Sequence, residues 1–287
     1  MLERIILLGA NGQLGMQLQE CVPKAVSLFA FTSAELDICK TDQLQKTCLE
    51  LAPTTIINAA AYTLVDQAES EKDQAFAVNA EAPGVLAEIC PNDCRIIHLS
   101  TDFVFDGNQT RPYRPGDATS PLNVYGASKL AGEQKLLSRR PDSLVVRTSW
   151  LYSARGKNFL TTMLRLMSER EELGIVDDQI GTPTSVMSLA DALWRFVANR
   201  SLHGIYHWTD QGLASWFDFA CEIQKQAFEL GLLNKKIPLH AISTAAYPTP
   251  ARRPAYSVLD KNDTYQAISF TGQDWQVELR KVLLSRI

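Results

Sequence analysis

Short runs of hydrophobic residues alternate with longer amphipathic stretches over about the first 150 residues of this 287-residue chain. Short apolar runs bounded by turn residues are typical of strands buried on both faces of a sheet, and amphipathic stretches are typical of helices that cover one. We predict strands at residues 4–8, 26–31, 54–59, 95–99 and 143–147, and helices that include residues 73–90 and 123–139.

This alternation predicts an α/β fold, a Rossmann-type doubly wound parallel sheet with helices on both faces. After residue 150 the pattern is less regular, although residues 158–169 and 215–230 have helical periodicity and residues 205–208 resemble a strand. We predict one domain over residues 1–150, extended by about 175–203, and a smaller C-terminal α/β domain formed mainly by residues 151–287. The long loops 107–121 and 247–254 are suited to carry binding residues.

A glycine-rich turn follows the first predicted strand and opens a helix. Its glycines are spaced G-x-x-G-x-x-G. Glycines at such a position permit a tight turn and a close approach of the backbone to a pyrophosphate, and the helix N-terminus offers unpaired N–H groups to the anion. We therefore predict that residues 1–150 bind a dinucleotide, through Gly9, Asn11, Gly12, Gln13, Leu14 and Gly15.

The end of the second strand bears on which dinucleotide is bound. An acid there favours the free ribose 2′-OH of NAD, whereas an arginine accommodates the 2′-phosphate of NADP. The strand ends in Phe31, Thr32 and Ser33, so neither is present. Small hydroxyl side chains tolerate a 2′-phosphate without requiring it, so we expect NADPH, with NADH as the alternative. Asp37 and Ile38 are candidates to flank the adenine, and a helix cap is the alternative role.

Composition excludes several classes of function. The chain has 28 Lys+Arg against 32 Asp+Glu, a net charge of −4, which argues against a basic nucleic-acid-binding surface. No apolar run approaches the roughly 18–20 residues of a membrane span, and the N-terminal apolar stretch is too short for a signal peptide, so we expect a cytoplasmic protein without a membrane partner. Six scattered cysteines and four histidines show no metal-ligand spacing, so we expect neither disulfides nor a zinc site.

Candidate catalytic residues lie at the start of the predicted helix 123–139. Tyr125 and Lys129 are one helical turn apart and so share a face. Tyrosine, with a pKa of about 10, is a poor acid–base catalyst at neutral pH unless a nearby ammonium stabilises its phenolate. Thr101, or Ser100 beside it, ends the fourth predicted strand and can donate a hydrogen bond to a carbonyl oxygen that gains charge. These residues suit hydride transfer to or from a carbonyl.

Together with these motifs, further stretches resemble the extended short-chain dehydrogenase/reductases and, more narrowly, the dTDP-4-dehydrorhamnose reductase family. The resemblance extends over nearly the whole chain. Residues 58–69, Asn79, 100–107, 120–133 and 147–150 match patterns common to many sugar-nucleotide reductases and epimerases. Residues 178–184 and 247–260 match patterns much more specific to this reductase family.

The resemblance implies an NAD(P)H-dependent reductase that acts on the C4 ketone of dTDP-4-dehydro-L-rhamnose, a small nucleotide-sugar substrate. Tyr125 would protonate the C4 oxygen, Lys129 would tune Tyr125, and Thr101 would polarise the ketone. The further cofactor residues that it implies are Ala59, Ala60, Ala61, Tyr62 and Asn79, beside Tyr125 and Lys129. The substrate residues that it implies are Val65, Asp102, Phe103, Trp150, Asn158 and Arg252, with Arg253 as the alternative to Arg252 for the diphosphate.

The chain departs from the family pattern at specific positions. Phe103 stands where members usually have tyrosine, which removes a hydroxyl beside the sugar. Some members dimerise through magnesium held by carboxylates, but the matching positions here are Gln17 and Met187, and a thioether is a poor ligand for a hard cation. We therefore expect no metal, and a monomer or a weak homodimer.

Other functions fit parts of the pattern. A reductase of another dTDP-4-keto-6-deoxy sugar would share all of these motifs, and a 4-epimerase would share Tyr125 and Lys129. A dehydratase needs a carboxylate pair after Thr101, where only Asp102 is present. Some family members are non-catalytic NADP-binding regulatory subunits, which have no need to keep Tyr125, Lys129 and Thr101 together. We therefore favour an enzyme.

Overall fold

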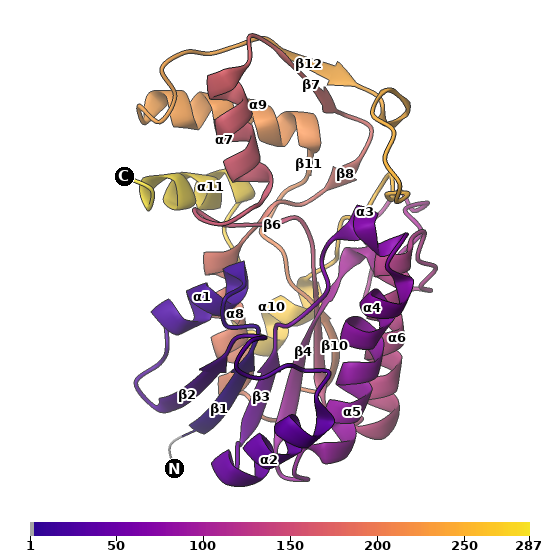
Figure 1. Cartoon of the computed structure of the whole chain (residues 1–287). Coiled ribbons are helices and arrows are strands. Elements are labelled where there is room, and N and C mark those ends of the chain that lie inside the picture. The colour runs from indigo at the N-terminus through magenta and orange to yellow at the C-terminus, as the bar shows by residue number, and fades with distance from the viewer. Residues whose placement is uncertain (1–2) are drawn as a thin grey trace.

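A six-stranded parallel sheet is the centre of the lower part of the molecule in the computed structural model, which describes residues 3–287 (Figure 1). The strand order is β10-β5-β4-β3-β1-β2, so the chain crosses over on both sides of β1. The predicted α/β doubly wound sheet is confirmed, and each predicted strand is present with ends that differ by a residue or two. The strands are β1 (Glu3–Leu8), β2 (Val26–Phe31), β3 (Thr55–Asn58), β4 (Arg95–Thr101), β5 (Leu144–Thr148) and β10 (Gly204–His207).

Helices cover both faces of this sheet, because successive side chains of a strand point to opposite faces. Ile5 and Leu7 of β1 belong to one hydrophobic core, and Ile6 and Leu8 belong to the other. Burial on both faces explains why the strands have continuous apolar runs rather than alternating patterns. The first core includes α1 (Gln13–Glu20), α8 (Val186–Ala198) and α10 (Asn262–Ile268), and the second includes α2 (Thr41–Leu51), α5 (Ala82–Ile89) and α6 (Val124–Arg139).

The helix predicted at residues 73–90 contains a wide turn. The π-helical segment η1 (Ala77–Glu81) separates α4 (Lys72–Phe76) from α5, and the N–H of Ala82 donates to the carbonyl of Ala77. Asn79 lies in this wide turn and is 1% exposed. Its side chain accepts from Tyr62 N (2.9 Å) and donates to Tyr62 O (3.0 Å), which fixes the chain just before α3 (Val65–Ala68).

The other three predicted helices begin at residues whose side chains cap them. Asn123, Asn158 and Ser215 accept hydrogen bonds from the backbone N–H groups of Gly126, Thr161 and Asp218, respectively. Such caps satisfy N–H groups that have no partner within the helix. The last two of these residues precede α7 (Phe159–Glu169) and α9 (Trp216–Glu229).

A second part with its own hydrophobic core lies above the carboxyl edge of the sheet (Figure 1). It combines α7, α9 and α11 (Trp275–Leu284) with pairs of short strands. α8 lies in the segment 175–203 that was predicted to extend the first domain, whereas β10 and α10 come from the region predicted as the second domain. All three join the sheet and its helices, so the chain passes between the two parts more than once. The short pairs are β6 (Leu151–Tyr152) with β9 (Thr184–Ser185), β7 (Leu173–Val176) with β12 (Leu239–Ile242), and β8 (Ile180–Gly181) with β11 (Ala214–Ser215).

Two short 3-10 helices, η2 (Asp102–Val104) and η3 (Thr244–Ala246), complete the fold. Among the described residues, 3–287, no helix has both the length and the apolar character needed to cross a membrane.

Candidate active site

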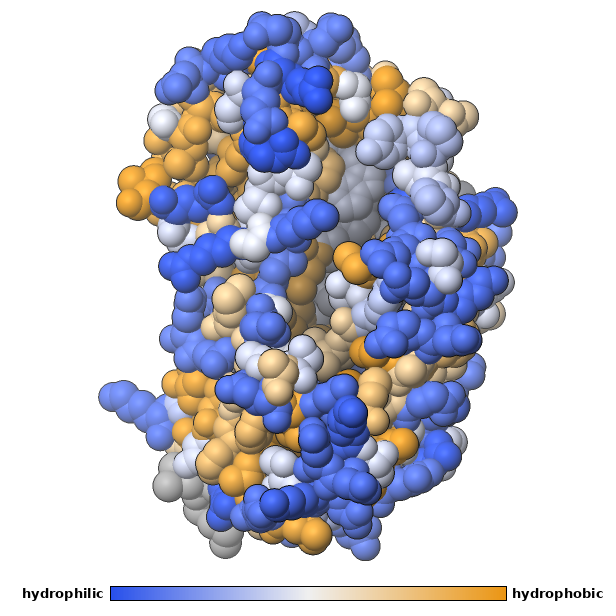
Figure 2. Space-filling view, in the orientation of Figure 1, coloured by the Kyte–Doolittle hydropathy of each residue, from blue (hydrophilic) through white to orange (hydrophobic). Residues whose placement is uncertain are grey.

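A cavity of about 560 Å³ opens at the carboxyl ends of β1, β3, β4 and β5, in the hollow between the two parts (Figure 2). This is where ligands bind in doubly wound folds. Most of the residues predicted from the sequence meet in this cavity. They are Asn11, Gly12, Gln13, Leu14, Gly15, Ala59, Ala61, Thr101, Asp102, Tyr125, Lys129, Trp150 and Asn158.

The glycine turn has the shape that a dinucleotide needs. Gly9 has a φ of 86°, and a Cβ on it would lie 2.8 Å from the backbone nitrogen of Ala60. A Cβ on Gly15 would collide with the carbonyl oxygen of Gly9. Helix α1 begins at Gln13, and its N-cap residue Gly12 makes no side-chain cap, so the N–H groups of the first turn are free for a pyrophosphate. The residues present therefore fit the phosphates of a nicotinamide dinucleotide.

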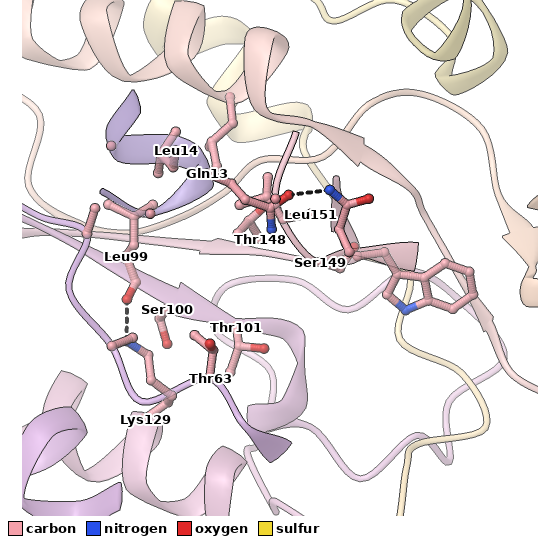
Figure 3. A pocket seen from close by; sticks show the side chains of 18 of the residues that line it. Gln13, Leu14, Thr63, Leu99, Ser100, Thr101, Lys129, Thr148, Ser149 and Leu151 are labelled. Carbon is pink, nitrogen blue, oxygen red and sulfur yellow. Dashed lines mark hydrogen bonds between the residues drawn. The ribbon is translucent and has the colours of Figure 1, made fainter. Parts of the chain in front are cut away.

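Tyr125 and Lys129 project from the first turns of α6 into the cavity. Lys129 is 2% exposed, and its ammonium donates to the carbonyl of Leu99 at 2.6 Å (Figure 3). The Thr101 hydroxyl donates to Asp102 Oδ1 at 3.0 Å, on the same side of the cavity. Phe103 packs edge-on against the ring of Tyr125, with 5.8 Å between ring centres. An acid–base phenol, an ammonium and a hydroxyl donor are thus held around one space.

Burial shifts the pKa values of these groups strongly. It raises the pKa of Tyr125 to about 12, an effect that the Thr101 hydroxyl reduces and the Asp102 carboxylate increases. It lowers the pKa of Lys129 to about 8, against the opposing charge of Glu133. It raises the pKa of Asp102 to about 7, although hydrogen bonds from Ser257 and Thr101 lower it. Each group is less favourably charged than in water, because burial removes the hydration of the charged form.

A buried ion pair lies behind the catalytic wall. Glu133 and Arg147 are each 2% exposed, and Arg147 donates to both carboxylate oxygens of Glu133, at 2.9 and 2.6 Å. The hydroxyl of Ser100 donates to Glu133 Oε1 at 2.5 Å. Ser100, the alternative to Thr101, therefore directs its proton away from the cavity.

His98, on β4, faces Lys129 across a short distance. Asn58 Oδ1 accepts the N–H of Ala60 at 3.2 Å, so its amide Nδ2 faces His98 Nδ1 at 3.0 Å. This hydrogen-bond pattern makes Nδ1 the acceptor and assigns the ring proton to Nε2, which lies 3.5 Å from Lys129 Nζ. Burial and the charge of Lys129 lower the pKa of His98 well below its usual value, so the ring is neutral.

The upper wall of the cavity comes from the second part of the molecule. Trp150 has a φ of 46°, and its indole stacks on Trp216 with 3.6 Å between ring centres and an interplanar angle of 7°. The side-chain oxygen of Gln13 accepts from Asn158 Nδ2 and from Ser153 Oγ, each at 2.7 Å. The glycine turn is therefore tied directly to the N-terminus of α7.

Comparison with known proteins identifies the family. Residues 3–286 match the RmlD substrate binding domain family. The chain is 40% identical over 291 residues to dTDP-4-dehydrorhamnose reductase of Escherichia coli strain K12, with 97% of this chain and 96% of that protein covered. The chain belongs to the dTDP-4-dehydrorhamnose reductase family. The corresponding enzyme of Aggregatibacter actinomycetemcomitans is 41% identical over 287 residues, with 97% and 98% covered.

A solved structure agrees with this membership. The crystal structure of dTDP-4-dehydrorhamnose reductase from Bacillus anthracis strain Ames, in complex with NADP, is 39% identical and has a TM-score of 0.93, with 99% of this chain and 100% of that chain covered. The predicted family and the predicted class, an NAD(P)H-dependent oxidoreductase, are confirmed. The prediction of NADPH as cofactor is supported by the NADP complex.

Some residues predicted on the cofactor side do not line the cavity. Ile38 is 5% exposed and packs in the core with α2, and the Asp37 carboxylate accepts the N–H of Cys39 at 2.9 Å. The Tyr62 hydroxyl donates to Glu71 Oε2 at 2.8 Å. Gly9, Ala60 and Asn79 also do not line the cavity, and the roles predicted for Asp37 and Ile38 beside the adenine stay predictions.

On the substrate side, the two arginines of the loop 247–254 have different surroundings. Arg252 is exposed, and its carbonyl accepts from Asn123 Nδ2 at 2.8 Å. Arg253 pairs with Asp66 at 2.8 and 3.0 Å. Arg253 also lines a second cavity of about 430 Å³ in the upper part, with Phe159, Met163, Gln179, Trp216 and Tyr247. Val65, Phe103 and Arg252 do not line the first cavity.

Several residues of the first cavity were not predicted. Thr148 ends β5 and Ser149 follows it, and the rule that sites gather at carboxyl strand ends could have found them. The others adjoin predicted residues in the chain, as Met16, Leu99 and Leu151 do, or reach the cavity through packing between distant segments, which no local pattern signals. They are Met16, Thr63, Leu99, Leu151, Gly156, Lys157 and Leu189.

Gln17 and Met187, the positions that the resemblance matched to magnesium ligands, lie outside this cavity. Gln17 and Met187 line a separate hollow of about 110 Å³, together with Glu20. In the part of the chain that the structure describes, no group of three His, Cys, Asp or Glu side chains is arranged to hold a metal ion.

Proposed function

We propose that the chain reduces the C4 ketone of dTDP-4-dehydro-L-rhamnose to give dTDP-L-rhamnose, with NADPH or NADH as the reductant. The observation that carries this proposal is the meeting of Tyr125, Lys129 and Thr101 in one cavity with the glycine turn. The nicotinamide, when bound, supplies the hydride. Membership of the reductase family supports this choice of sugar nucleotide.

In this proposal Tyr125 donates its proton to the C4 oxygen. With a pKa of about 12 in the buried cavity, the phenol is fully protonated at neutral pH and ready to act as the acid. The ammonium of Lys129 stabilises the phenolate that remains. The Thr101 hydroxyl, which donates to Asp102 in this structure, rotates to donate its hydrogen bond to the oxygen as it gains charge. The carbonyl of Leu99 holds Lys129 in place at 2.6 Å.

We assign the rest of the substrate, beyond the reacting ketone, to the upper wall of the first cavity and the region above it. Asp102 and Trp150 line the first cavity, and Trp150 stacks on Trp216, which borders the second cavity. We assign the sugar to the first cavity and the nucleoside diphosphate to the path toward the second. Arg253 lines that second cavity, so we favour it over Arg252 as the diphosphate residue.

A coupled assay at 340 nm tests the proposal. The substrate is dTDP-4-dehydro-L-rhamnose generated enzymatically, offered with NADPH and then with NADH. We expect Tyr125→Phe to lower kcat by at least ~10²-fold, because the proton donor is lost. Tyr206→Phe, on β10 and remote from the cavity, is the matched control and should retain activity. NADPH binding without oxidation by the wild type would contradict the proposed substrate.

A further inference from the structure

The structure places the carboxylate of Glu35 at the end of β2, although neither the last residue of the strand nor the two that follow it are acids. Glu35 is exposed, and its Oε2 accepts from the backbone N–H of Thr32 at 2.9 Å and from the Thr32 hydroxyl at 2.8 Å. The turn is closed by the N–H groups of Glu35 and Leu36, which donate to the Thr32 carbonyl. The Glu35 carboxylate therefore lies beside Thr32, the first residue after β2, although Glu35 is three positions further along the chain.

This strand end is next to the glycine turn. β2 is the edge strand beside β1 (Figure 1), and the N–H groups of Gly9 and Ala10 both donate to the carbonyl of Phe31, at 3.1 and 2.9 Å. In doubly wound folds that bind dinucleotides, the adenosine ribose lies here, and an acid at this place accepts the ribose 2′-OH. Glu35 is thus placed to meet the 2′ position.

The surrounding segments do not neutralise this carboxylate. Residues 9–15 and 26–39 contain no Lys or Arg, and the first basic residue after them is Lys40, the N-cap residue of α2. The other acid of the second segment, Asp37, is engaged with Cys39. The Thr32 hydrogen bonds lower the pKa of Glu35, so it is charged at neutral pH. A 2′-phosphate, with a charge of about −1.5 to −2, would therefore approach a like charge with no cation from these segments to offset it.

We infer that Glu35 is the residue by which this chain discriminates between NADH and NADPH, accepting a hydrogen bond from the 2′-OH and repelling the 2′-phosphate. The inference rests on the proposed function only in requiring that a nicotinamide dinucleotide occupies the glycine turn. Because Glu35 is exposed and screened by salt, the repulsion weakens NADPH binding without abolishing it. The chain then uses NADH beside NADPH.

Equilibrium binding tests this inference without turnover. Dissociation constants for NADH, NADPH, 5′-ADP and adenosine 2′,5′-bisphosphate are measured for the wild type, Glu35→Gln and Thr32→Val. For Glu35→Gln we expect the two 2′-phosphorylated ligands to bind about 3- to 10-fold more tightly, from the loss of one like charge at close range. NADH and 5′-ADP should bind no more tightly than to the wild type.

Thr32→Val is the matched control, because it removes one hydrogen bond to Glu35 and leaves the carboxylate charge. We expect its NADPH-to-NADH ratio to stay within about twofold of the wild type, which supports a charge effect. An unchanged ratio in Glu35→Gln, with both dinucleotides still bound, would overturn this inference and leave the proposed function intact. Failure of the wild type to bind any of the four ligands would overturn both.

Discussion

At the scale of single residues, burial determines the protonation states of the acid–base groups in the cavity. It raises the pKa of Tyr125 to about 12 and lowers that of Lys129 to about 8, since each charged form loses its hydration. Tyr125 is therefore a proton donor over the physiological range. Lys129 can stabilise the phenolate only while it is itself protonated.

We predict that kcat/KM falls above about pH 8, because Lys129 loses its charge there. Replacing His98 by Gln should move this alkaline limb to higher pH, since the Nε2–H that faces the ammonium at 3.5 Å is removed. The measurement is the pH profile of kcat/KM for both proteins between pH 6 and about 10. A profile that stays flat to pH 10 in the wild type would rule out this role of Lys129.

A second prediction at this scale concerns the effect of Asp102 on stability. Its pKa is raised to about 7 from 3.8, so the native state binds more protons than the unfolded state between these values. Stability contributed by this group is therefore present at low pH and is lost as the pH rises through about 7. Asp102→Asn should increase the unfolding free energy by on the order of 1 kcal/mol at pH 8 and by little at pH 4. Urea unfolding at both values tests this; equal effects at the two pH values would contradict it.

At the scale of elements, the turn from β1 to α1 is the most constrained segment. Gly15 lies against the carbonyl oxygen of Gly9, so any side chain displaces the turn from the helix. We predict that Gly15→Ala lowers the unfolding free energy by about 1–3 kcal/mol and weakens NADPH binding by at least ~10-fold. Gly116→Ala is the control, because a Cβ there meets nothing within 4 Å. Equal behaviour of the two variants in urea unfolding and NADPH titration would refute the prediction.

At the scale of the whole molecule, a few contacts join the sheet to the upper part. Gln13 is such a contact, since its side-chain oxygen accepts from Ser153 and Asn158 across the hollow. The stack of Trp150 on Trp216 continues the connection between the two cavities. The cofactor site, on α1, and the proposed sugar site, beside Trp150 and Asn158, are therefore connected by direct side-chain contacts.

We predict that Gln13→Met raises KM for the sugar nucleotide by about 5- to 20-fold, because two hydrogen bonds that orient the upper wall are lost. Dinucleotide affinity should change by less than about threefold, since the glycine backbone remains. Gln17→Met, one turn further along α1, is the matched control and should leave both constants near the wild type. A Gln13 variant with equal losses for both ligands would contradict a role confined to the upper wall.

Much of the fold could be predicted from the sequence because it depends on local chain properties. Apolar runs marked the strands, and Asn123, Asn158 and Ser215 cap the helices near the predicted starts. The spacing of Tyr125 and Lys129 followed from one helical turn. The wide turn at Asn79 could not be predicted, because α4 and α5, with 5 and 8 residues, are too short for the phase shift that the extra residue causes in the hydrophobic pattern to be recognised.

The sequence by itself determined the sheet, the glycine turn and the catalytic helix, since each follows from residues within one or two turns of chain. The tertiary structure alone decided the rest. It brought β10 to the sheet edge, set His98 against Lys129, tied Gln13 to Asn158, and placed Arg253 rather than Arg252 at a cavity. Such contacts join residues far apart in the chain, and only the packing of whole elements determines which side chains meet.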